Sequence, residues 1–317
     1  MTSPDSPSSE APVMEPGFDV VTGAFSFTGR SIARRLLAEE RRVRTLTNHP
    51  QRPGTEDIKV DVAPLQFTDR AALVQSLRGA DVLYNTYWIR FRRGRMGFGD
   101  AVANTRTLMG AAAEAGVRKV VHISTSNPSI DSHLDFYAGK ARTEEIVRAS
   151  GIQWAIVRPT LIFGEGEILI NNIAWLLRRM PIFAIPGDGK FRVQPVAVED
   201  VAELATWAAA QTDNLTLDAA GPETLTYAEL VEGIAIAVAR RPRFVYMPPR
   251  LTLLAGDVVS AYVHDVMLTR QELQGLMAEL IVSQEKPRGT RRFDNWLLRD
   301  AETLGRKYAS ELDRHWR

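Results

Sequence analysis

Short apolar runs alternate along the first half of the chain with longer segments whose apolar residues recur at helical spacing. The first run, Val20-Val21, enters a turn, and further strands are expected at 42–47, 57–61, 81–86, 119–124 and 154–158. Helices are expected from Ser31, at 68–77 with Thr68 as N-cap, at 100–115 with Gly116 as C-cap, and at 136–149. This alternation predicts an α/β fold, a doubly wound parallel sheet of the Rossmann type with helices on both faces.

The regular alternation ends near Arg158. A helix is expected at 168–180, a loop containing proline and glycine at 181–193, and a strand or loop followed by a helix at 196–204. Thr226 and Glu229 have the spacing of a capping box that opens a helix through Ala239. Two more helices are expected at 251–264 and 270–280, before a charged C-terminal helix. This half is therefore predicted to form a smaller, mostly helical C-terminal lobe.

The turn after the first strand has the glycine spacing of a dinucleotide-binding unit. It contains Gly23, Phe25, Ser26, Phe27, Thr28, Gly29 and Arg30, between an apolar run and a helical segment. The first glycine allows a tight turn, the helix N-terminus receives the pyrophosphate, and the last glycine lets helix and strand approach closely. Ser26 replaces the usual middle glycine, and its small side chain leaves room for phosphates and adds a hydroxyl donor. The alternative interpretation is an ordinary glycine-containing β–α turn.

The residues after the second strand bear on the choice of dinucleotide. An acidic residue about 20 positions after the glycines normally holds the ribose 2′-hydroxyl of NAD. The stretch from Thr45 to His49, which includes Asn48, contains no acid. Arg30 and Arg52 are candidate partners for a 2′-phosphate, although arginines are also common on solvated surfaces. The sequence therefore favours NADP over NAD.

Composition and charge exclude several classes of function. The net charge of +1 gives no strong field toward nucleic acid or lipid, and the absence of cysteine removes disulfides and thiolate chemistry. The five histidines lack metal-site spacing, so we expect no metal. No apolar run reaches the roughly 18 residues of a membrane span and the N-terminus is polar, so the default expectation is a cytoplasmic protein.

The same patterns predict how the chain divides. Residues 1–17 are rich in serine, proline and acidic residues, and we expect a disordered tail. Residues 18–165 are expected to form the dinucleotide-binding domain, to which the chain returns at about 194–222. Residues 166–317 are expected to form a substrate or lid lobe.

The ordered set of motifs resembles the extended and atypical branch of the short-chain dehydrogenase/reductase family. Its markers are the glycine turn, Asp61-Val62, Asn104, Ser124-Thr125-Ser126, Lys140 and the run from Arg158-Pro159 through Leu161 to Gly164. Later positions (Asn171, Gly187, Gln194-Pro195 and Asp200) make the chain similar to the NADPH-binding accessory subunit of respiratory complex I and to bacterial epimerase/dehydratase-like proteins. The resemblance implies cofactor contacts at Asp61, Val62, Asn85, Thr86, Tyr87, Ser124, Lys140, Pro159 and Leu161.

The proton relay of that family is altered here. The family uses a tyrosine four residues before the lysine, where this chain has Phe136, while Tyr137 lies only three residues before Lys140. One helix position is about 100° of rotation, which moves a phenol several ångströms. The resemblance implies catalytic roles for Lys140, Ser126 and Tyr137, but we favour the interpretation of Tyr137 as a surface or packing aromatic. Ser124 and Thr125 are equally interpreted as partners of loop backbone.

Three hypotheses for the function follow. The first is an NADP-dependent epimerase, dehydratase or reductase that transfers a hydride on an unidentified small molecule. The second is a dinucleotide-binding structural or sensing module without turnover, in contact with a protein partner or a second copy. The third, nucleic-acid binding, rests only on the arginines from Arg90 to Arg95, and we favour a lid or protein contact for that loop. Trp88, Glu165, Glu167 and Asn171 are further candidates to face a ligand.

Overall fold

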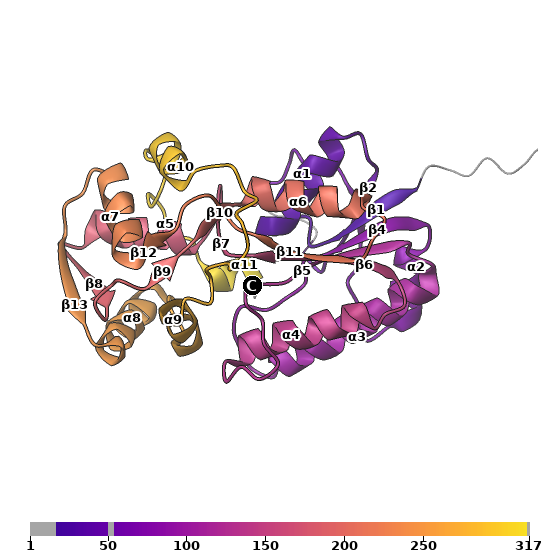
Figure 1. Cartoon of the computed structure of the whole chain (residues 1–317), viewed down its shortest axis with the longest axis horizontal. Coiled ribbons are helices and arrows are strands. Elements are labelled where there is room, and N and C mark those ends of the chain that lie inside the picture. Colours follow the sequence, from indigo (N-terminus) through magenta and orange to yellow (C-terminus); the bar gives the residue numbers. More distant parts are fainter. Residues whose placement is uncertain (1–16, 50–53, 316–317) are drawn as a thin grey trace, which may run out of the picture.

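A seven-stranded parallel sheet forms the larger part of the structure, a computed structural model that describes residues 17–49 and 54–315. The strand order is β11-β6-β5-β4-β1-β2-β3 (Figure 1). The strands are β1 (Phe18–Thr22), β2 (Val43–Leu46), β3 (Asp61–Ala63), β4 (Ala80–Asn85), β5 (Lys119–Ile123), β6 (Gln153–Pro159) and β11 (Leu215–Ala219). This order confirms the predicted doubly wound Rossmann fold.

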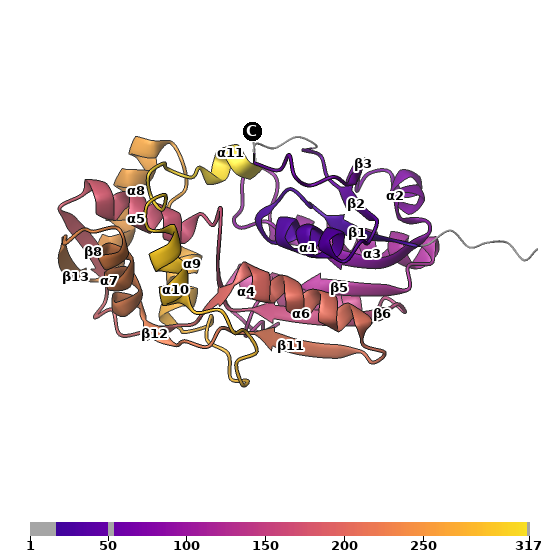
Figure 2. The same ribbon diagram turned by 90° about the horizontal axis from the view of Figure 1, so that it is seen from above.

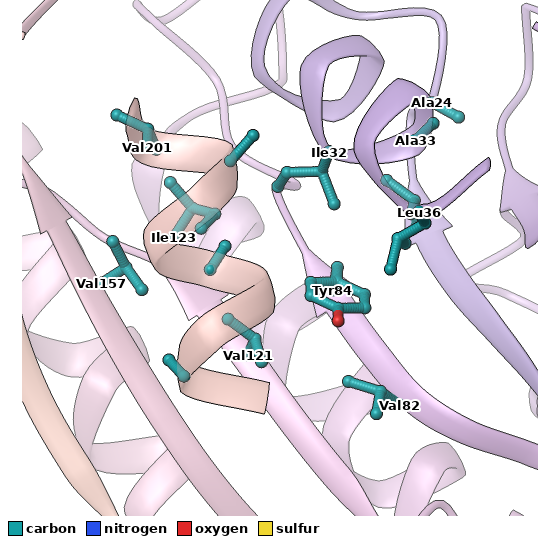
Figure 3. Packing of buried hydrophobic residues seen from close by; sticks show 14 of the residues in the cluster. Ala24, Ile32, Ala33, Leu36, Val82, Tyr84, Val121, Ile123, Val157 and Val201 are labelled. Atoms are coloured by element: carbon teal, nitrogen blue, oxygen red, sulfur yellow. The ribbon is translucent and has the colours of Figure 1, made fainter. Parts of the chain in front are cut away.

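Helices cover both faces of this sheet. α1 (Phe27–Ala38) and α6 (Val198–Ala210) cover one face, and α2 (Arg70–Leu77), α3 (Phe98–Ala115) and α4 (Asp135–Arg148) cover the other (Figure 1). Neighbouring strand residues alternate between the two cores, since Val121 packs with α1 and α6 whereas Val120 packs with α2, α3 and α4. Figure 3 shows Ile32, Leu36 and Val201 meeting the strand side chains in the first of these cores.

Two local predictions in this half are wrong. The third strand is 61–63 rather than 57–61, because Ile58 follows a turn closed by Thr55 and inserts its side chain into the core beside α1. The N-cap of α2 is Asp69, not Thr68, because the Asp69 carboxylate accepts from the Ala72 N–H at 2.9 Å. The prediction of a disordered tail concerns residues that, up to 16, lie outside the described part of the chain.

The remaining elements form a smaller lobe around a separate core. Its helices are α5 (Leu169–Arg179), α7 (Tyr227–Ala237), α8 (Pro249–Val263), α9 (Arg270–Met277), α10 (Phe293–Asp300) and α11 (Glu311–His315). Short ladders join β7 (Leu161–Phe163) to β10 (Pro195–Ala197), β8 (Ile182–Pro186) to β13 (Arg243–Met247), and β9 (Arg192–Val193) to β12 (Leu225–Thr226). Figure 2 shows these elements gathered at one end of the sheet.

Some predictions for this lobe are confirmed and others are wrong. The capping box of Thr226 and Glu229 is confirmed, as is the left-handed C-cap at Gly116 in the other half. The predicted loop at 181–193 is wrong, because it contains β8 and β9, whose strand partners lie far away along the chain. The predicted charged C-terminal helix is two short helices, α10 and α11. Within the described residues, no helix has the length and apolar character needed to cross a membrane.

Candidate dinucleotide and substrate cleft

The turn between β1 and α1 has the close backbone approach that a phosphate-binding turn requires. Gly23 adopts φ +70°, a left-handed conformation that favours glycine. A Cβ on Gly29 would lie 2.2 Å from the Gly23 carbonyl oxygen, so only glycine fits there. Helix α1 begins at Phe27, directly after the N-cap Ser26, and leaves its first backbone N–H groups for an anion. These residues fit a dinucleotide pyrophosphate.

Ser26 differs in one respect from its predicted role. Its hydroxyl donates to the Gly23 carbonyl at 2.6 Å and therefore braces the turn rather than pointing to a phosphate. Ser26, Gly23 and Phe27 border a cleft of about 1210 Å³. Phe25, Thr28 and Gly29 support the turn from outside that border.

One half of this cleft lies over β2 and β3. Asn48 holds its wall, donating to the Leu65 carbonyl at 3.0 Å and accepting from the Leu65 N–H at 3.2 Å. Phe67 and Tyr87 meet at 4.7 Å between ring centroids, and Asn104 donates to the Tyr87 hydroxyl at 2.8 Å. An adenine fits between such apolar and aromatic walls.

Asp61 and Val62 do not border the cleft, contrary to the expectation from the family resemblance. Both lie within β3, because that strand begins four residues later than predicted. Leu65 and Phe67, which follow the strand, take their place in the cleft wall. The apolar residues after β3 were a signal that sequence reasoning missed.

The two arginines predicted to bind a 2′-phosphate are not both in place to do so. Arg30 lies outside the main cleft, and its guanidinium donates to the Glu165 carbonyl at 2.6 Å. Arg52 lies outside the described residues. His49 does border the cleft, after β2. Arg30 therefore does not face the main cleft in this structure.

A chain of buried polar side chains links the ends of β1, β4 and β5. Asn85 is fully buried, and its Oδ1 accepts from the Thr22 hydroxyl while its Nδ2 lies 3.0 Å from His122 Nδ1. His122 Nε2 lies 3.2 Å from the Thr143 hydroxyl. Asn85 therefore supports the cleft floor from below, and it is Thr86, bonded to the Thr22 carbonyl, that borders the cleft.

The buried His122 makes stability depend on pH. Burial, and then the charge of Lys140, lower its pKa to about 3, below the ordinary 6.5. The unfolded chain therefore takes up a proton as pH falls from about 7, and the free energy of unfolding drops by up to about 1.4 kcal/mol per pH unit. We expect His122→Gln to reduce this slope between pH 6 and pH 5, measured by urea unfolding.

Glutamine at position 122 keeps an acceptor for Asn85 and a donor for Thr143, so the variant should fold. His133→Gln, at an exposed histidine, is the matched control and should keep the wild-type slope. An unchanged slope in His122→Gln would show that His122 does not carry the effect.

Lys140 is buried beneath an aromatic cluster instead of facing the cleft. Its Nζ donates to the Ile123 carbonyl at 3.0 Å and lies 4.9 Å from the Trp88 ring centroid. Burial lowers its pKa to about 7. Trp88 packs with Phe98 and Phe136, so Phe136 occupies part of the wall where the family has its proton donor.

Gly139 allows Trp88 to take this position. A Cβ at residue 139 would lie 2.8 Å from the Trp88 ring, so Gly139→Ala must displace the indole. We expect a net loss of about 1–2 kcal/mol in the free energy of unfolding, because overpacking outweighs the helix propensity of alanine. Gly256→Ala, in α8 with open space around it, is the control and should gain about 0.5–1 kcal/mol. A stabilised Gly139→Ala, measured by urea unfolding, would contradict this packing.

The three predicted catalytic residues are not brought together in the cleft. Tyr137 borders it but is 6% exposed, and its ring packs against Gly275 of α9. Burial, and then the charge of Glu272, raise the pKa of Tyr137, opposite to the shift that an activated phenol needs. The Ser126 hydroxyl donates to the Leu280 carbonyl at 2.7 Å, away from the cleft.

Thr125, rather than Ser126 or Ser124, reaches the cleft from the end of β5. Ser124 is buried on the side of Glu144, and Pro159 is buried at the end of β6. Thr160 and Leu161, which follow Pro159, also border the cleft. The sequence predicts a threonine at this strand end, but it does not predict that the Thr125 side chain faces the cleft.

The loop with the arginines is joined to the C-terminal lobe. Arg90 pairs with Glu272 and Glu311, and these carboxylates raise its pKa although burial lowers it. Glu167 borders the cleft and caps the start of α5 through the Leu169 and Ile170 N–H groups. Glu165 and Asn171 lie outside the cleft, and Asn171 holds the segment near Gly305.

The chain is similar in sequence to known proteins. Over 249 residues the chain is 27% identical to a protein named ceramide reductase from Caulobacter vibrioides, covering 78% of each chain. It is 26% identical over 275 residues to the mitochondrial 40 kDa subunit of NADH-ubiquinone oxidoreductase from Neurospora crassa, covering 84% of this chain and 72% of that subunit. This second likeness confirms the predicted resemblance to the complex I subunit.

A solved structure shares the fold. The structure of MoeE5 in complex with UDP-glucose and NAD superposes with a TM-score of 0.68 at 18% identity, covering 90% of this chain and 98% of that one. The family described as NAD(P)H-binding matches residues 23–211, which include the glycine turn and the strands of the sheet from β2 to β6. The chain therefore belongs to the NAD(P)H-binding family.

Proposed function

We propose that this protein is an NADP(H)-dependent reductase that acts on an apolar carbonyl compound. The observation that carries the proposal is the size of the cleft, which is continuous from the Gly23 turn to the C-terminal lobe and measures about 1210 Å³. Ligand pockets usually measure about 300–1,000 Å³. The cleft therefore has room for a second ligand beside a dinucleotide.

The lining of the cleft favours an apolar second ligand. The part formed by α4, α9 and the neighbouring segments is lined by the apolar side chains of Trp88, Phe136, Leu276, Val266, Leu268 and Ile281. Polar side chains, among them Arg92 and Arg270, border the same part, but Arg90 is paired with Glu272 and Glu311, and Gln271 donates to Asp135. A sugar nucleotide would need several polar partners that are not already engaged within the protein. The relative from Caulobacter vibrioides, named ceramide reductase, supports a lipid-like substrate.

The preference for NADP is supported by two features after β2. No acidic residue follows that strand through His49, so no carboxylate repels a 2′-phosphate. His49 borders the cleft, and its ring N–H can donate a hydrogen bond to a phosphate. Arg52 remains a candidate because its position in the sequence follows His49 by three residues.

A nicotinamide bound in the cleft supplies the hydride for such a reduction. The substrate oxygen then needs a polarising hydrogen bond and a proton. Thr125, the strand-end hydroxyl that borders the cleft, would donate its hydroxyl proton to that oxygen and take up a proton from solvent in exchange, so that the carbonyl, the hydride and one solvent proton give the alcohol. The aromatic wall of Trp88 and Phe136 excludes water from the reacting end. Lys140 supports this wall by packing against the Trp88 ring, and its Nζ is held there by the Ile123 carbonyl.

A second function, a dinucleotide-binding module without turnover, is favoured by one specific observation. Phe136 replaces the family's phenol, and Trp88 separates it from Lys140. The likeness to the 40 kDa subunit of NADH-ubiquinone oxidoreductase supports a protein partner for such a module.

Two measurements on the full chain distinguish these functions. Native mass spectrometry identifies the dinucleotide that copurifies, and we expect NADP(H). Oxidation of NADPH is then followed at 340 nm with a long-chain 3-ketone in detergent and, as a comparison, with UDP-glucose-derived keto sugars. Turnover of the ketone alone supports the reductase. Bound NADP(H) without turnover of either class supports the module, and absence of any dinucleotide contradicts both.

A further inference from the structure

Helix α8 turns an apolar stripe to solvent. Leu251, Leu254, Val258 and Tyr262 are 52–77% exposed and recur at spacings of three, four and four residues, so they share one face. Thr252 is the buried residue of this helix. Leu253, Val259 and Val263 are half-buried, so α8 has apolar residues on its inner side as well. A helix on a globular protein normally turns a polar face to solvent, so the exposed apolar stripe indicates that another surface covers α8.

Helix α8 lies in the part of the smaller lobe that is away from the seven-stranded sheet (Figures 1 and 2). There α8 packs on β8, which pairs in parallel with β13. Ile182, at the start of β8, is 55% exposed and adds to the apolar surface. Helix α8 and the β8–β13 ladder therefore form part of the outer surface of this end, beside α7.

Four arginines lie in the segments that border β13 and α8. Arg240 and Arg241 precede β13, Arg243 opens it opposite Ile182, and Arg250 lies in the first turn of α8. All four are exposed, and within residues 17–49 and 54–315 their guanidinium groups take part in no ion pair or hydrogen bond. Asp257 is the acidic residue on α8. The surface thus combines an apolar stripe with an excess of positive charge.

We propose that this end of the protein docks on an anionic lipid surface. The stripe of α8 enters the region between headgroups and acyl chains, as interfacial amphipathic helices do, and the arginines lie at the phosphates. The proposal goes beyond the proposed function, because docking requires neither dinucleotide nor turnover.

The charges favour a lipid surface over a second copy of this chain. A symmetric contact through α8 would bring two sets of four unpaired arginines together, and like charges across an interface are destabilising. An anionic bilayer instead offers opposite charge to every arginine at once. The chain continues from α8 to Val266 and Leu268, which line the cleft, so docking would place the cleft close to lipid.

Vesicle flotation with the full chain tests this proposal. We expect binding to vesicles of phosphatidylcholine with phosphatidylglycerol at least about tenfold tighter than to pure phosphatidylcholine, and weaker with added salt. The double variant Arg240→Gln/Arg243→Gln should weaken binding to the anionic vesicles by roughly five-fold per arginine. Leu254→Gln/Val258→Gln should weaken binding to them by at least about tenfold.

Leu298→Gln is the matched control, because Leu298 is equally apolar and 72% exposed but lies on α10. It should bind vesicles as the wild type does, and circular dichroism should show every variant folded. Absence of binding to anionic vesicles at millimolar lipid would overturn the proposal. A dimer in light scattering that Leu254→Gln/Val258→Gln disperses, without vesicle binding by the wild type, would overturn it in favour of a second copy.

Discussion

Replacing Ser26 with glutamate is expected to weaken NADPH binding by about ten- to a hundredfold. Ser26 is the N-cap of α1 and borders the cleft, so a carboxylate there faces the pyrophosphate that the helix N-terminus would otherwise attract. Isothermal titration or quenching of intrinsic fluorescence measures the affinity. The fold should survive because Ser26 is only partly buried.

Ser26→Gln is the matched control for charge. Both variants lose the hydrogen bond to the Gly23 carbonyl and add a side chain of the same size, so the difference between them reports the charge alone. We expect Ser26→Gln to retain most of the affinity, within about threefold of the wild type. Equal weakening by both variants would mean that bulk, not charge, decides, and unchanged affinity in Ser26→Glu would remove the dinucleotide from this turn.

The sheet was predictable because its signals are local. Each β–α unit carries a short apolar run followed by helical spacing, and the glycines of the first turn are required by its backbone. Gly29, for example, lies against the Gly23 carbonyl, so the steric constraint of the turn is the reason for the glycine in the sequence pattern. The capping box of Thr226 and Glu229 belongs to the same class, since all of its partners lie within four residues.

The C-terminal lobe was less predictable because its ladders depend on distant partners. Ile182 pairs with Arg243, and Arg192 pairs with Thr226. A strand of two to five residues has too few positions to show alternation, and its partner lies tens of residues away. The predicted bounds of the third strand were wrong for a related reason, because Ile58 is buried although it lies in a turn, and its burial produces the same alternation as a strand.

The candidate site shows the limit of motif reasoning. Motifs place Ser124, Ser126 and Lys140 at the correct end of the sheet, but they do not state which way each side chain points. Ser126 turns to Leu280, which is 154 positions away in the sequence. Lys140 is covered by Trp88, a contact that depends on Gly139 lacking a side chain. Packing between the two lobes therefore decides which hydroxyl reaches the cleft.

The absence of a phenol at position 136 leads to an expected result on turnover. With the ketone substrate of the proposed function, Thr125→Val should lower kcat by about 10–100-fold, because it removes the strand-end hydroxyl that faces the cleft and keeps its shape. Tyr137→Phe should change kcat by less than about threefold, since a general acid contributes about 10²–10⁴-fold and Tyr137 is held against α9 with a raised pKa.

Two further variants sharpen this comparison. Ser126→Ala removes a hydroxyl of the same strand end that is bonded to the Leu280 carbonyl, so it controls for loss of any hydroxyl there and should leave kcat within about threefold. Phe136→Tyr restores the family's phenol beside the aromatic wall. Because the Trp88 ring contacts both position 136 and the Lys140 amine, kcat should rise only if the indole moves and lets Lys140 reach the new phenol. Loss of turnover in Tyr137→Phe together with normal turnover in Thr125→Val would reverse the assignment and make Tyr137 the proton donor. Steady-state kinetics with the ketone substrate measures kcat for these variants and for the wild type.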